Sequence, residues 1–273
     1  MPFVENRGAR IYWDEQGQGV PMLLIMGLGY PSDMWHRPRP ELAAHYRTIA
    51  LDNRGSGRSD AGGSNSIALM ASDAAAVLDA SGVDRAHIFG VSMGGMIAQE
   101  FALRYPQRVR SLILACTHPG GLHAKPPKIG VFQALWARAT MTTEEARKVF
   151  IPILYDASTS RERIEEDFAI LKNWIPTPAA FRGQLRAIFW WHCYSRLPRI
   201  TAPTLVIHGE SDRLVPPQNG ELIASRIPGA KLVMIPHAGH IFGTDQPEAS
   251  RRAVAEFLAQ VEAPQAGNAR PRK

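Results

Sequence analysis

The sequence contains very little cysteine, with only Cys116 and Cys193 among 273 residues. They lie far apart and form neither a C-x-x-C motif nor the spacing of a metal site, which argues against a disulfide framework. Free thiols are typical of a reducing compartment, so we expect a cytoplasmic protein. We interpret Cys116, in the run SLILAC, as a small core residue, because free cysteine is usually buried and inert.

Long hydrophobic runs are also missing. No apolar segment approaches the roughly 18 residues that a transmembrane helix needs, so we predict no membrane span. The first residues, MPFVENRGAR, lack the basic-then-apolar pattern of a secretory signal. The most apolar piece, PMLLIMGLG, has the length of one strand and its turn.

The net charge of +6 raises the question of a nucleic-acid partner. The arginines are dispersed, however, and half of the excess comes from Arg270, Arg272 and Lys273 in the final PQAGNARPRK, which has no acidic residue. Its composition predicts a flexible basic tail. We therefore predict no nucleic-acid partner. Nothing in the sequence indicates the oligomeric state.

What the sequence does contain is a regular alternation of strand-like and helix-like segments in a composition of 45% apolar and 21% charged residues, ordinary for a globular protein. Residues 3–17 predict a hairpin that turns at Asn6, Arg7 and Gly8. Strand patterns follow at 21–26, 46–52, 86–91, 109–116, 202–209 and 230–236, and helical patterns at 35–46, 66–83, 93–105, 216–227 and 246–261. This rhythm predicts an α/β fold, a parallel sheet with helices on both faces.

The rhythm breaks from about Pro119 to Pro198. This stretch is helical in pattern and contains no convincing strand; prolines divide it at 126–127, 152, 176 and 178. The chain is therefore predicted to consist of a core (1–118 and 199–262), an inserted helical cap (119–198) and a basic tail (263–273). Sites in open parallel sheets form at the carboxyl ends of the strands, and the cap is expected to cover that edge.

Four of the six tryptophans fall in the predicted cap: Trp136, Trp174, Trp190 and Trp191. They favour an apolar or aromatic substrate in an enclosed pocket. The alternative is that they pack the cap onto the core. Trp190 and Trp191 are neighbours, so on a helix they cannot both face a pocket.

The motif with the clearest chemistry is Gly90-Val91-Ser92-Met93-Gly94, a G-x-S-x-G between a strand and a helix. This spacing is typical of a sharp, strained turn that lifts a serine hydroxyl above the sheet edge and points a helix N-terminus at it. We predict that Ser92 is a nucleophile. The alternative is a glycine-rich turn with an incidental serine.

A serine nucleophile needs a base that is oriented by an acid, and on such a scaffold the chain order is serine, acid, histidine. Asp212 follows one predicted strand and His240 follows the next, so both are predicted to lie at the edge where Ser92 lies. Glu210 and Asp245 compete for the acid role, and His237 competes for the base role. The remaining histidines form no cluster with metal-ligand spacing, so we predict no metal.

The oxyanion of the reaction needs two N–H donors. One is expected from the residue after the serine and the other from the turn after the first buried strand, here MGLGYPSDMW. We assign the donors to the backbone N–H groups of Met93 and Leu28.

Taken together, PMLLIMGLG, LDNRGSGRSD, GVSMGG, APTLVIHGESDRLVPP and HAGH resemble the α/β-hydrolase superfamily, in its lidded serine-hydrolase branch. The resemblance covers almost the whole chain. It implies an eight-stranded, mostly parallel sheet and Ser-Asp-His chemistry without a cofactor, with Asp52, Arg54 and Ser59 as structural residues. Many members have His-Gly where this chain has Met26-Gly27, but backbone donors do not depend on that histidine.

Within the superfamily, the chain looks most like small esterases, 3-oxoadipate enol-lactonase-like enzymes and methylesterases. We therefore expect a serine hydrolase that cleaves a carboxylic ester or lactone of a small, largely apolar molecule. Hydrolysis of a C–C bond or perhydrolysis with the same triad, or a slow hydrolase that acts as a ligand receptor, are the alternatives. Arg182, Arg186 and Arg196 are candidates for contacting an acidic substrate.

Overall fold

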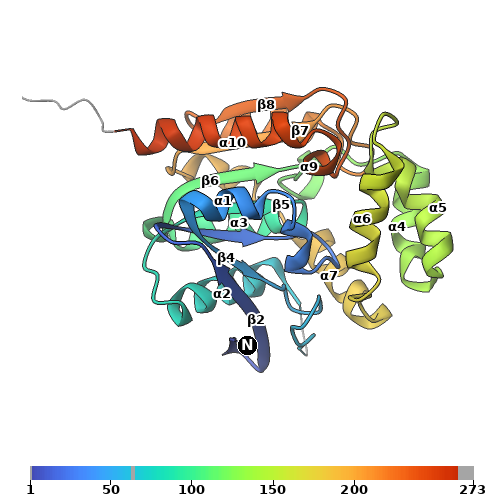
Figure 1. The fold of residues 1–273 in the computed structure, drawn as a ribbon, viewed down its shortest axis with the longest axis horizontal. Coiled ribbons are helices and arrows are strands. Elements are labelled where there is room, and N and C mark those ends of the chain that lie inside the picture. Colours follow the sequence, from blue (N-terminus) through green and yellow to red (C-terminus); the bar gives the residue numbers. More distant parts are fainter. Residues whose placement is uncertain (1, 63–64, 264–273) are drawn as a thin grey trace, which may run out of the picture.

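A computed structural model describes residues 2–62 and 65–263 of the chain. Eight strands form one sheet (Figure 1). They are β1 (Phe3–Asn6), β2 (Ala9–Gln16), β3 (Val20–Ile25), β4 (Tyr46–Leu51), β5 (Ala86–Val91), β6 (Val109–Ala115), β7 (Thr204–Gly209) and β8 (Lys231–Ile235). The order across the sheet is β1-β2-β4-β3-β5-β6-β7-β8, with every pair parallel except β1–β2 and β2–β4. The predicted fold class is confirmed.

The predicted hairpin is present, and its turn is formed by Arg7 and Gly8. Both have positive φ, 45° and 77°. Such a pair gives a tight two-residue connection whose twist matches that of the flanking strands.

Helices cover both faces of the sheet (Figure 1). They are α1 (Arg39–His45), α2 (Ile67–Ala80), α3 (Met93–Arg104), α4 (Ile129–Ala137), α5 (Thr143–Leu154), α6 (Arg161–Leu171), α7 (Pro178–Trp190), α8 (Gln218–Arg226), α9 (Phe242–Asp245) and α10 (Pro247–Glu262). Short 3₁₀ turns include η1 (Ser32–Trp35) and η5 (Tyr194–Arg199). The short α9 has no counterpart among the predicted elements.

The core consists of two apolar layers, one on each face of the sheet. Alternate residues of a strand point to opposite faces. Leu23 and Ile25 accordingly pack with α2, α3 and α8, whereas Met22 and Leu24 pack with α10 and the residues around η1. These strands are buried on both faces, which is why they read as continuous apolar runs.

The helices α4 to α7 form an insertion between β6 and β7. Its two ends meet in an isolated antiparallel bridge between Gly120 and His192, and the Cys193 N–H donates to the Pro119 carbonyl at 2.8 Å. Gly120 has φ 68°, and a Cβ there would collide with the Trp191 carbonyl. The insertion therefore leaves and rejoins the core at one point.

The expectation that Pro152 divides two helices is wrong, because it lies inside α5, two residues before that helix ends. A proline in the last turn removes one N–H, and the preceding turns keep their hydrogen bonds. Thr142 and Glu145 form a capping box that fixes the start of α5. Pro178, by contrast, starts α7, where its fixed φ suits the first helical position.

A buried carboxylate joins the insertion to the core. Asp167 of α6 is fully buried and accepts hydrogen bonds from the Thr244 hydroxyl at 2.7 Å and the Tyr155 hydroxyl at 3.0 Å. Its other oxygen lies 3.3 Å from the Arg37 guanidinium. Arg37 and Thr244 belong to the core, so this cluster fixes α6 beside the carboxyl ends of the strands.

The loop that follows β4 is held by its own polar residues. Asp52 accepts from the Ser32 N–H, Arg54 binds Asp73 through two hydrogen bonds in the interior, and the Ser59 hydroxyl donates to the Asp52 carbonyl. All these contacts are within the scaffold.

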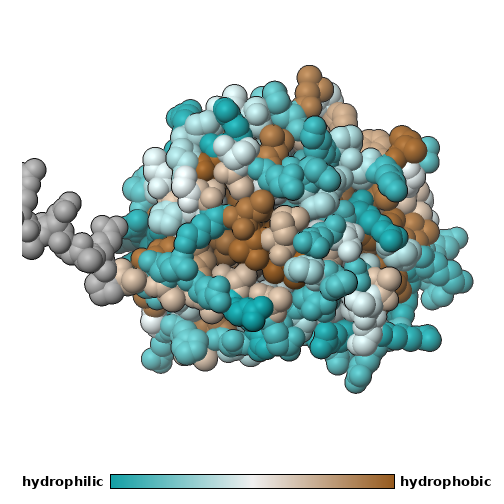
Figure 2. Space-filling model, turned by 90° about the horizontal axis from the view of Figure 1, so that it is seen from above, coloured by the Kyte–Doolittle hydropathy of each residue, from teal (hydrophilic) through white to brown (hydrophobic). Residues whose placement is uncertain are grey.

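Seen from above, most of the surface is hydrophilic, and hydrophobic side chains gather in a hollow near its middle (Figure 2). Across residues 2–62 and 65–263, no helix combines the length and the apolar character that crossing a bilayer requires. Of the predicted basic tail, residues 264–273 lie outside the described part of the chain.

Candidate active site

Ser92 occupies the sharp turn between β5 and α3. Its φ of 58° and ψ of −120° are strained values for a residue with a side chain. Two contacts hold this geometry: the Ser92 N–H donates to the Ala115 carbonyl at 2.8 Å, and the Thr117 hydroxyl donates to the Ser92 carbonyl at 2.7 Å. Both partners come from β6 and the residues just after it. The neighbouring strand thus stabilises the turn.

The glycines around Ser92 allow strand and helix to pass closely. A Cβ on Gly90 would collide with the Gly94 carbonyl, and a Cβ on Gly94 would collide with the Ile25 carbonyl of β3. A Cβ on Gly27 would lie 3.1 Å from the Ser92 Cβ. At positions 90 and 94 only a hydrogen atom fits, so this turn requires glycine there.

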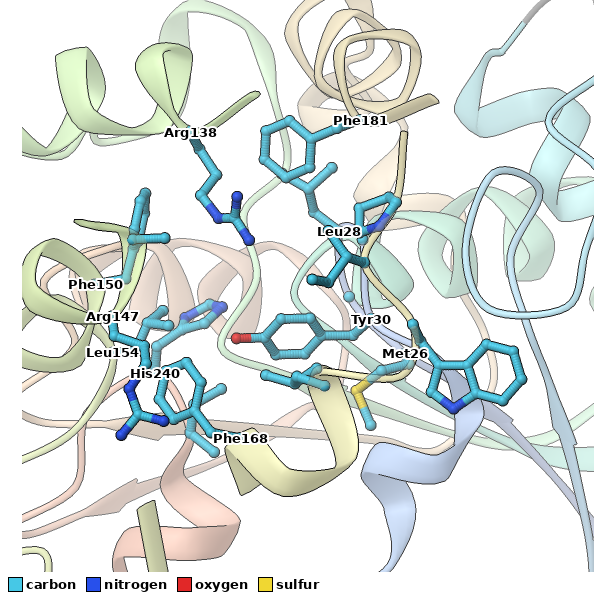
Figure 3. Close-up of a pocket in the computed structure, with 18 of the residues that line it drawn as sticks. Met26, Leu28, Tyr30, Arg138, Arg147, Phe150, Leu154, Phe168, Phe181 and His240 are labelled. Carbon is cyan, nitrogen blue, oxygen red and sulfur yellow. The ribbon is translucent and has the colours of Figure 1, made fainter. Parts of the chain in front are cut away.

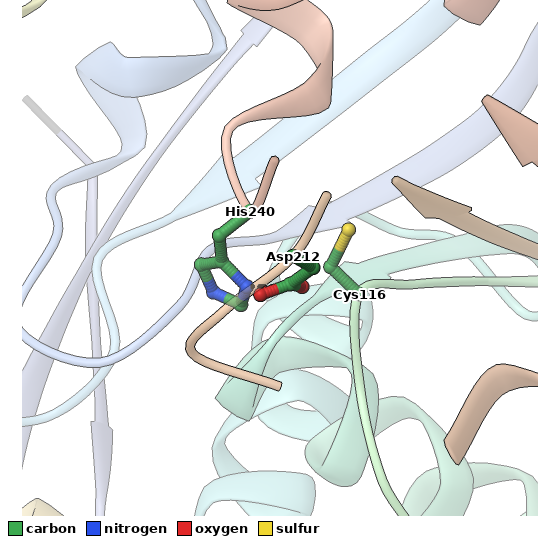
Figure 4. Close-up of side chains that lie close together, drawn as sticks. All are labelled: Cys116, Asp212 and His240. Carbon is green, nitrogen blue, oxygen red and sulfur yellow. Dashed lines mark hydrogen bonds and ion pairs between the residues drawn. The ribbon is translucent and has the colours of Figure 1, made fainter. Parts of the chain in front are cut away.

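Asp212 and His240 lie in successive loops, after β7 and after β8, and form a hydrogen bond of 2.8 Å between Asp212 Oδ2 and His240 Nδ1 (Figure 4). Asp212 Oδ1 accepts from the N–H groups of Leu214 and Val215 at 2.9 and 2.8 Å. Burial opposes ionisation of Asp212, but the charge and hydrogen bonds of His240 and His208 outweigh it and lower its pKa to about 2. An ionised carboxylate fixes the imidazole with its proton on Nδ1 and leaves Nε2 free to accept one.

The competing residues lie elsewhere. Glu210 is exposed, and His237 is likewise exposed in the turn after β8. Asp245 accepts hydrogen bonds from the Gly239 N–H at 2.6 Å and the Thr159 hydroxyl at 2.5 Å. Its contacts are with the loop before His240 and with the insertion, so it positions the loop and does not pair with the imidazole.

Ser92 and His240 line one pocket of about 340 Å³ together with Leu28. Its walls are mostly apolar and come from the turn after β3 and from the insertion (Figure 3). The aromatic residues that line it are Tyr30, Phe150, Phe168, Trp174 and Phe181. The pocket size is that of sites for small organic ligands.

Ser92 and His240 are not hydrogen-bonded to each other in this structure. Within the described residues, the Ser92 hydroxyl makes no hydrogen bond to His240 Nε2, although both groups line the same pocket. Such bonds are often long before a substrate binds. The N–H groups of Leu28 and Met93 likewise have no acceptor in the described part of the chain. Two unpaired donors therefore lie beside Ser92.

One cluster of side chains has the atom types of a metal site. Cys116, Asp212 and His240 bring three candidate ligand atoms within 4.8 Å of one another (Figure 4). The Asp212 carboxylate and the His240 imidazole already form a hydrogen bond with each other. Burial, followed by the charge of Asp212, raises the pKa of the Cys116 thiol, whereas metals bind the thiolate. The donor chemistry therefore favours a hydrogen-bonded cluster over a metal.

Several pocket residues were missed from the sequence. Of the four cap tryptophans, only Trp174 lines the pocket; Trp190 is exposed and Trp191 donates from its indole to Glu100. The candidates for contacting an acidic substrate, Arg182, Arg186 and Arg196, are also absent from its lining, which contains Arg138, Arg147 and Lys172 instead. Arg196 pairs with Glu100 at 2.8 Å.

Gln184 was missed as well. It is fully buried in α7, where it accepts a hydrogen bond from the Gly29 N–H beside Leu28. A signal was available, because Gln184 is the one polar residue in the otherwise apolar buried stripe that contains Ala180, Phe181, Leu185 and Ala187. Buried polar groups in such stripes are normally hydrogen-bonded.

Comparisons with known proteins agree with the fold. The family described as "alpha/beta hydrolase fold" matches residues 20–247. The 2-hydroxy-6-oxononadienedioate/2-hydroxy-6-oxononatrienedioate hydrolase of Burkholderia vietnamiensis is 35% identical over 269 residues, which cover 91% of each chain.

Two solved structures are similar along nearly the whole chain. Est816, described as an N-acyl homoserine lactone degrading enzyme, has a TM-score of 0.81 at 32% identity. The match covers 94% of this chain and 100% of Est816. The enol-lactonase of Burkholderia xenovorans LB400 has a TM-score of 0.85 at 25% identity with the same coverage. With the family match extending over most of its length, this chain belongs to the α/β-hydrolase family.

Proposed function

We propose that this protein is a serine hydrolase that cleaves a carboxylic ester or lactone of a small, largely apolar molecule. The observation that supports it best is one pocket that unites a strained serine, the unpaired N–H of Leu28 and an imidazole whose far nitrogen binds a buried carboxylate, with the unpaired N–H of Met93 directly after the serine. This is the set of groups that acyl transfer through a serine requires.

In the proposed reaction, Ser92 Oγ attacks the substrate carbonyl while His240 Nε2 takes its proton. The Leu28 and Met93 N–H groups stabilise the oxyanion, and Asp212 stabilises the imidazolium. The imidazolium then gives its proton to the departing alkoxide, which leaves an acyl group on Ser92. Water attacks this ester with His240 as the base, and the acid and free Ser92 are released.

We further propose that the helical insertion, residues 119–198, acts as a cap over a core of residues 1–118 and 199–262. In support, α4 to α7 supply most of the pocket wall opposite Ser92. A cytoplasmic site of action is part of the same proposal, and the two buried free cysteines are consistent with it.

The decisive experiment compares hydrolysis of p-nitrophenyl esters of increasing acyl length by the wild type and Ser92→Ala. We expect kcat to fall by roughly 10⁴ in the variant. Ser225→Ala, on the exposed side of α8, is the matched control and should keep full activity. Labelling with a fluorophosphonate should attach its phosphonyl group to Ser92 alone, with release of fluoride. A Ser92→Ala variant that keeps most of the activity would overturn the proposal.

A second candidate is hydrolysis of an oxo-dienoate, since the 35% identical relative is named for such substrates. This reaction would use the same three residues but cleave a C–C bond. Slow turnover of every p-nitrophenyl ester, combined with fluorophosphonate labelling of Ser92, would favour this candidate. Absence of both labelling and turnover would favour a ligand receptor instead.

A further inference from the structure

The pocket beside Ser92 has an uneven distribution of charge. Among otherwise mostly apolar lining residues it includes three cations, Arg138, Arg147 and Lys172, but one carboxylate, Glu165. A charged group on the wall of an apolar pocket is costly unless it is paired. An unpaired cation on this wall would therefore favour an anionic ligand.

Arg147 is already paired. Its guanidinium lies 2.5 Å from Glu165 and over the ring of Phe168, with 4.4 Å to the ring centroid. Lys172 is exposed at the rim. Arg138 is half-buried, and Figure 3 shows its guanidinium directed into the pocket. Across residues 2–62 and 65–263, no carboxylate lies within ion-pair distance of Arg138.

A second polar group points into the same space. In Figure 3 the Tyr30 hydroxyl projects toward the middle of the pocket, below the Arg138 guanidinium. Burial, with the charge of Asp167, raises the pKa of Tyr30, and the nearby charge of Arg138 opposes that rise. The net rise keeps the phenol protonated at neutral pH. Tyr30 can therefore donate a hydrogen bond to an acceptor that enters the pocket.

We propose that the substrate bears a carboxylate in addition to the bond that is cleaved, and that Arg138 binds this carboxylate with Tyr30 as a further donor. A guanidinium is permanently charged, and its fork of N–H groups matches the two oxygens of a carboxylate. Lys172 at the rim adds positive potential that draws an anion toward the entrance. The inference rests on the proposed function and specifies its substrate class.

The test uses two esters with the same acyl length, mono-p-nitrophenyl glutarate, which is anionic, and p-nitrophenyl pentanoate, which is neutral. We expect the wild type to have a higher kcat/KM for the glutarate. Arg138→Gln should lower kcat/KM for the glutarate by roughly 10- to 100-fold, mainly through KM, as expected for loss of a hydrogen bond to a charged group. Activity toward the pentanoate should change less than about threefold.

Arg182→Gln is the matched control. Arg182 is exposed on α7 and outside the pocket lining, so this variant makes the same change in net charge away from the site. Its preference between the two esters should equal that of the wild type. If Arg182→Gln and Arg138→Gln reduce the preference equally, the effect comes from overall charge and the inference is wrong.

The carboxylate could lie in the acyl or in the alcohol portion of the substrate. A second pair, carboxymethyl butyrate and ethyl butyrate followed by pH-stat titration, places the charge in the alcohol. A preference for the anion in either pair, lost in Arg138→Gln, supports the inference. No preference in both pairs overturns it.

Failure of this inference is distinguishable from failure of the proposed function. Hydrolysis of p-nitrophenyl pentanoate that depends on Ser92 without any dependence on Arg138 leaves the function intact and removes the inference. Calorimetric binding of glutarate gives a readout without turnover. The wild type should bind glutarate more tightly than the neutral diamide glutaramide, and Arg138→Gln should abolish that difference; equal binding of the two compounds by the wild type counts against the carboxylate site.

Discussion

The side-chain carbonyl of Gln184 in the insertion accepts a hydrogen bond of 2.8 Å from the backbone N–H of Gly29 in the core. Its amide nitrogen donates to the Arg54 carbonyl at 2.8 Å and to the Ser56 hydroxyl at 2.9 Å. All three bonds are buried. The turn that presents the Leu28 N–H to the pocket is thus held by a residue that lies 155 positions later in the sequence.

Replacing Gln184 by Met, which has a similar shape, should remove these bonds and leave the Gly29 N–H buried without a partner. We expect a loss of about 1–3 kcal/mol in the free energy of unfolding. At temperatures where the variant is fully folded, kcat should fall about 10-fold or more with little change in KM, because misplacing one oxyanion donor affects the transition state. Urea titration and steady-state kinetics measure the two effects. If the variant is less stable but has an unchanged kcat, Gln184 stabilises the fold without positioning the Leu28 N–H.

Gly94→Ala and Gly130→Ala form a matched pair. The added methyl group at position 94 would collide with the Ile25 carbonyl, so we expect a loss of about 1–3 kcal/mol in stability, or no folded protein. Position 130, in the exposed part of α4, has open space around it, and alanine there should stabilise the helix by about 0.5–1 kcal/mol. Thermal denaturation of the two variants tests the contrast. Equal stabilities would show that the turn at Ser92 is looser than described.

Asp212→Asn should keep the shape of the site while changing the orientation and tautomer of His240. By analogy with the serine-protease triad, we expect kcat to fall by about 10⁴-fold. Asp84→Asn, which replaces an exposed carboxylate far from the pocket, is the control and should behave as the wild type. If Asp212→Asn keeps more than a tenth of the wild-type activity, Asp212 is not the acid that orients His240.

Asp245 should make stability depend on pH. Burial raises its pKa to about 6, although hydrogen bonds from Thr159 and Gly239 act in the opposite direction. The folded state then binds a proton more tightly than the unfolded state, whose pKa is about 3.9. Between these values the folded state holds more protons, so the contribution of Asp245 to stability falls as the pH rises, by roughly 2 kcal/mol from pH 4 to 7.

Chemical denaturation of the wild type and Asp245→Asn at several pH values isolates this contribution. The difference between the two free energies of unfolding should change by that amount over the interval, with the variant gaining relative to the wild type as the pH rises. A constant difference would mean that Asp245 is ionised throughout.

The strands of the sheet and the turn at Ser92 could be predicted from the sequence because their causes are local. Buried parallel strands are continuous apolar runs, and the glycines at 90 and 94 mark the close passage of strand and helix. The loops that hold Asp212 and His240 follow directly from the ends of predicted strands. Each inference needed no more than the neighbouring residues.

The pocket wall could not be predicted in the same way. The positions of Arg138 and Gln184 depend on how four helices pack on the core, and that packing is fixed by contacts between distant residues such as Asp167 and Arg37. The sequence indicated that the insertion was helical and rich in aromatic residues. Which side chains face inward is a tertiary property, and the tryptophans and arginines that stood out in the sequence mostly face elsewhere.

The isolated bridge between Gly120 and His192, at the base of the insertion, has a consequence for how such a chain diversifies. The insertion begins and ends at adjacent positions. Replacing it is therefore equivalent, for the core, to exchanging one loop for another. A segment of different length or composition could be joined at that point without altering the register of any strand. The residues that line the pocket can therefore change with this segment, as long as the hydrogen bond between Gln184 and the Gly29 N–H is kept.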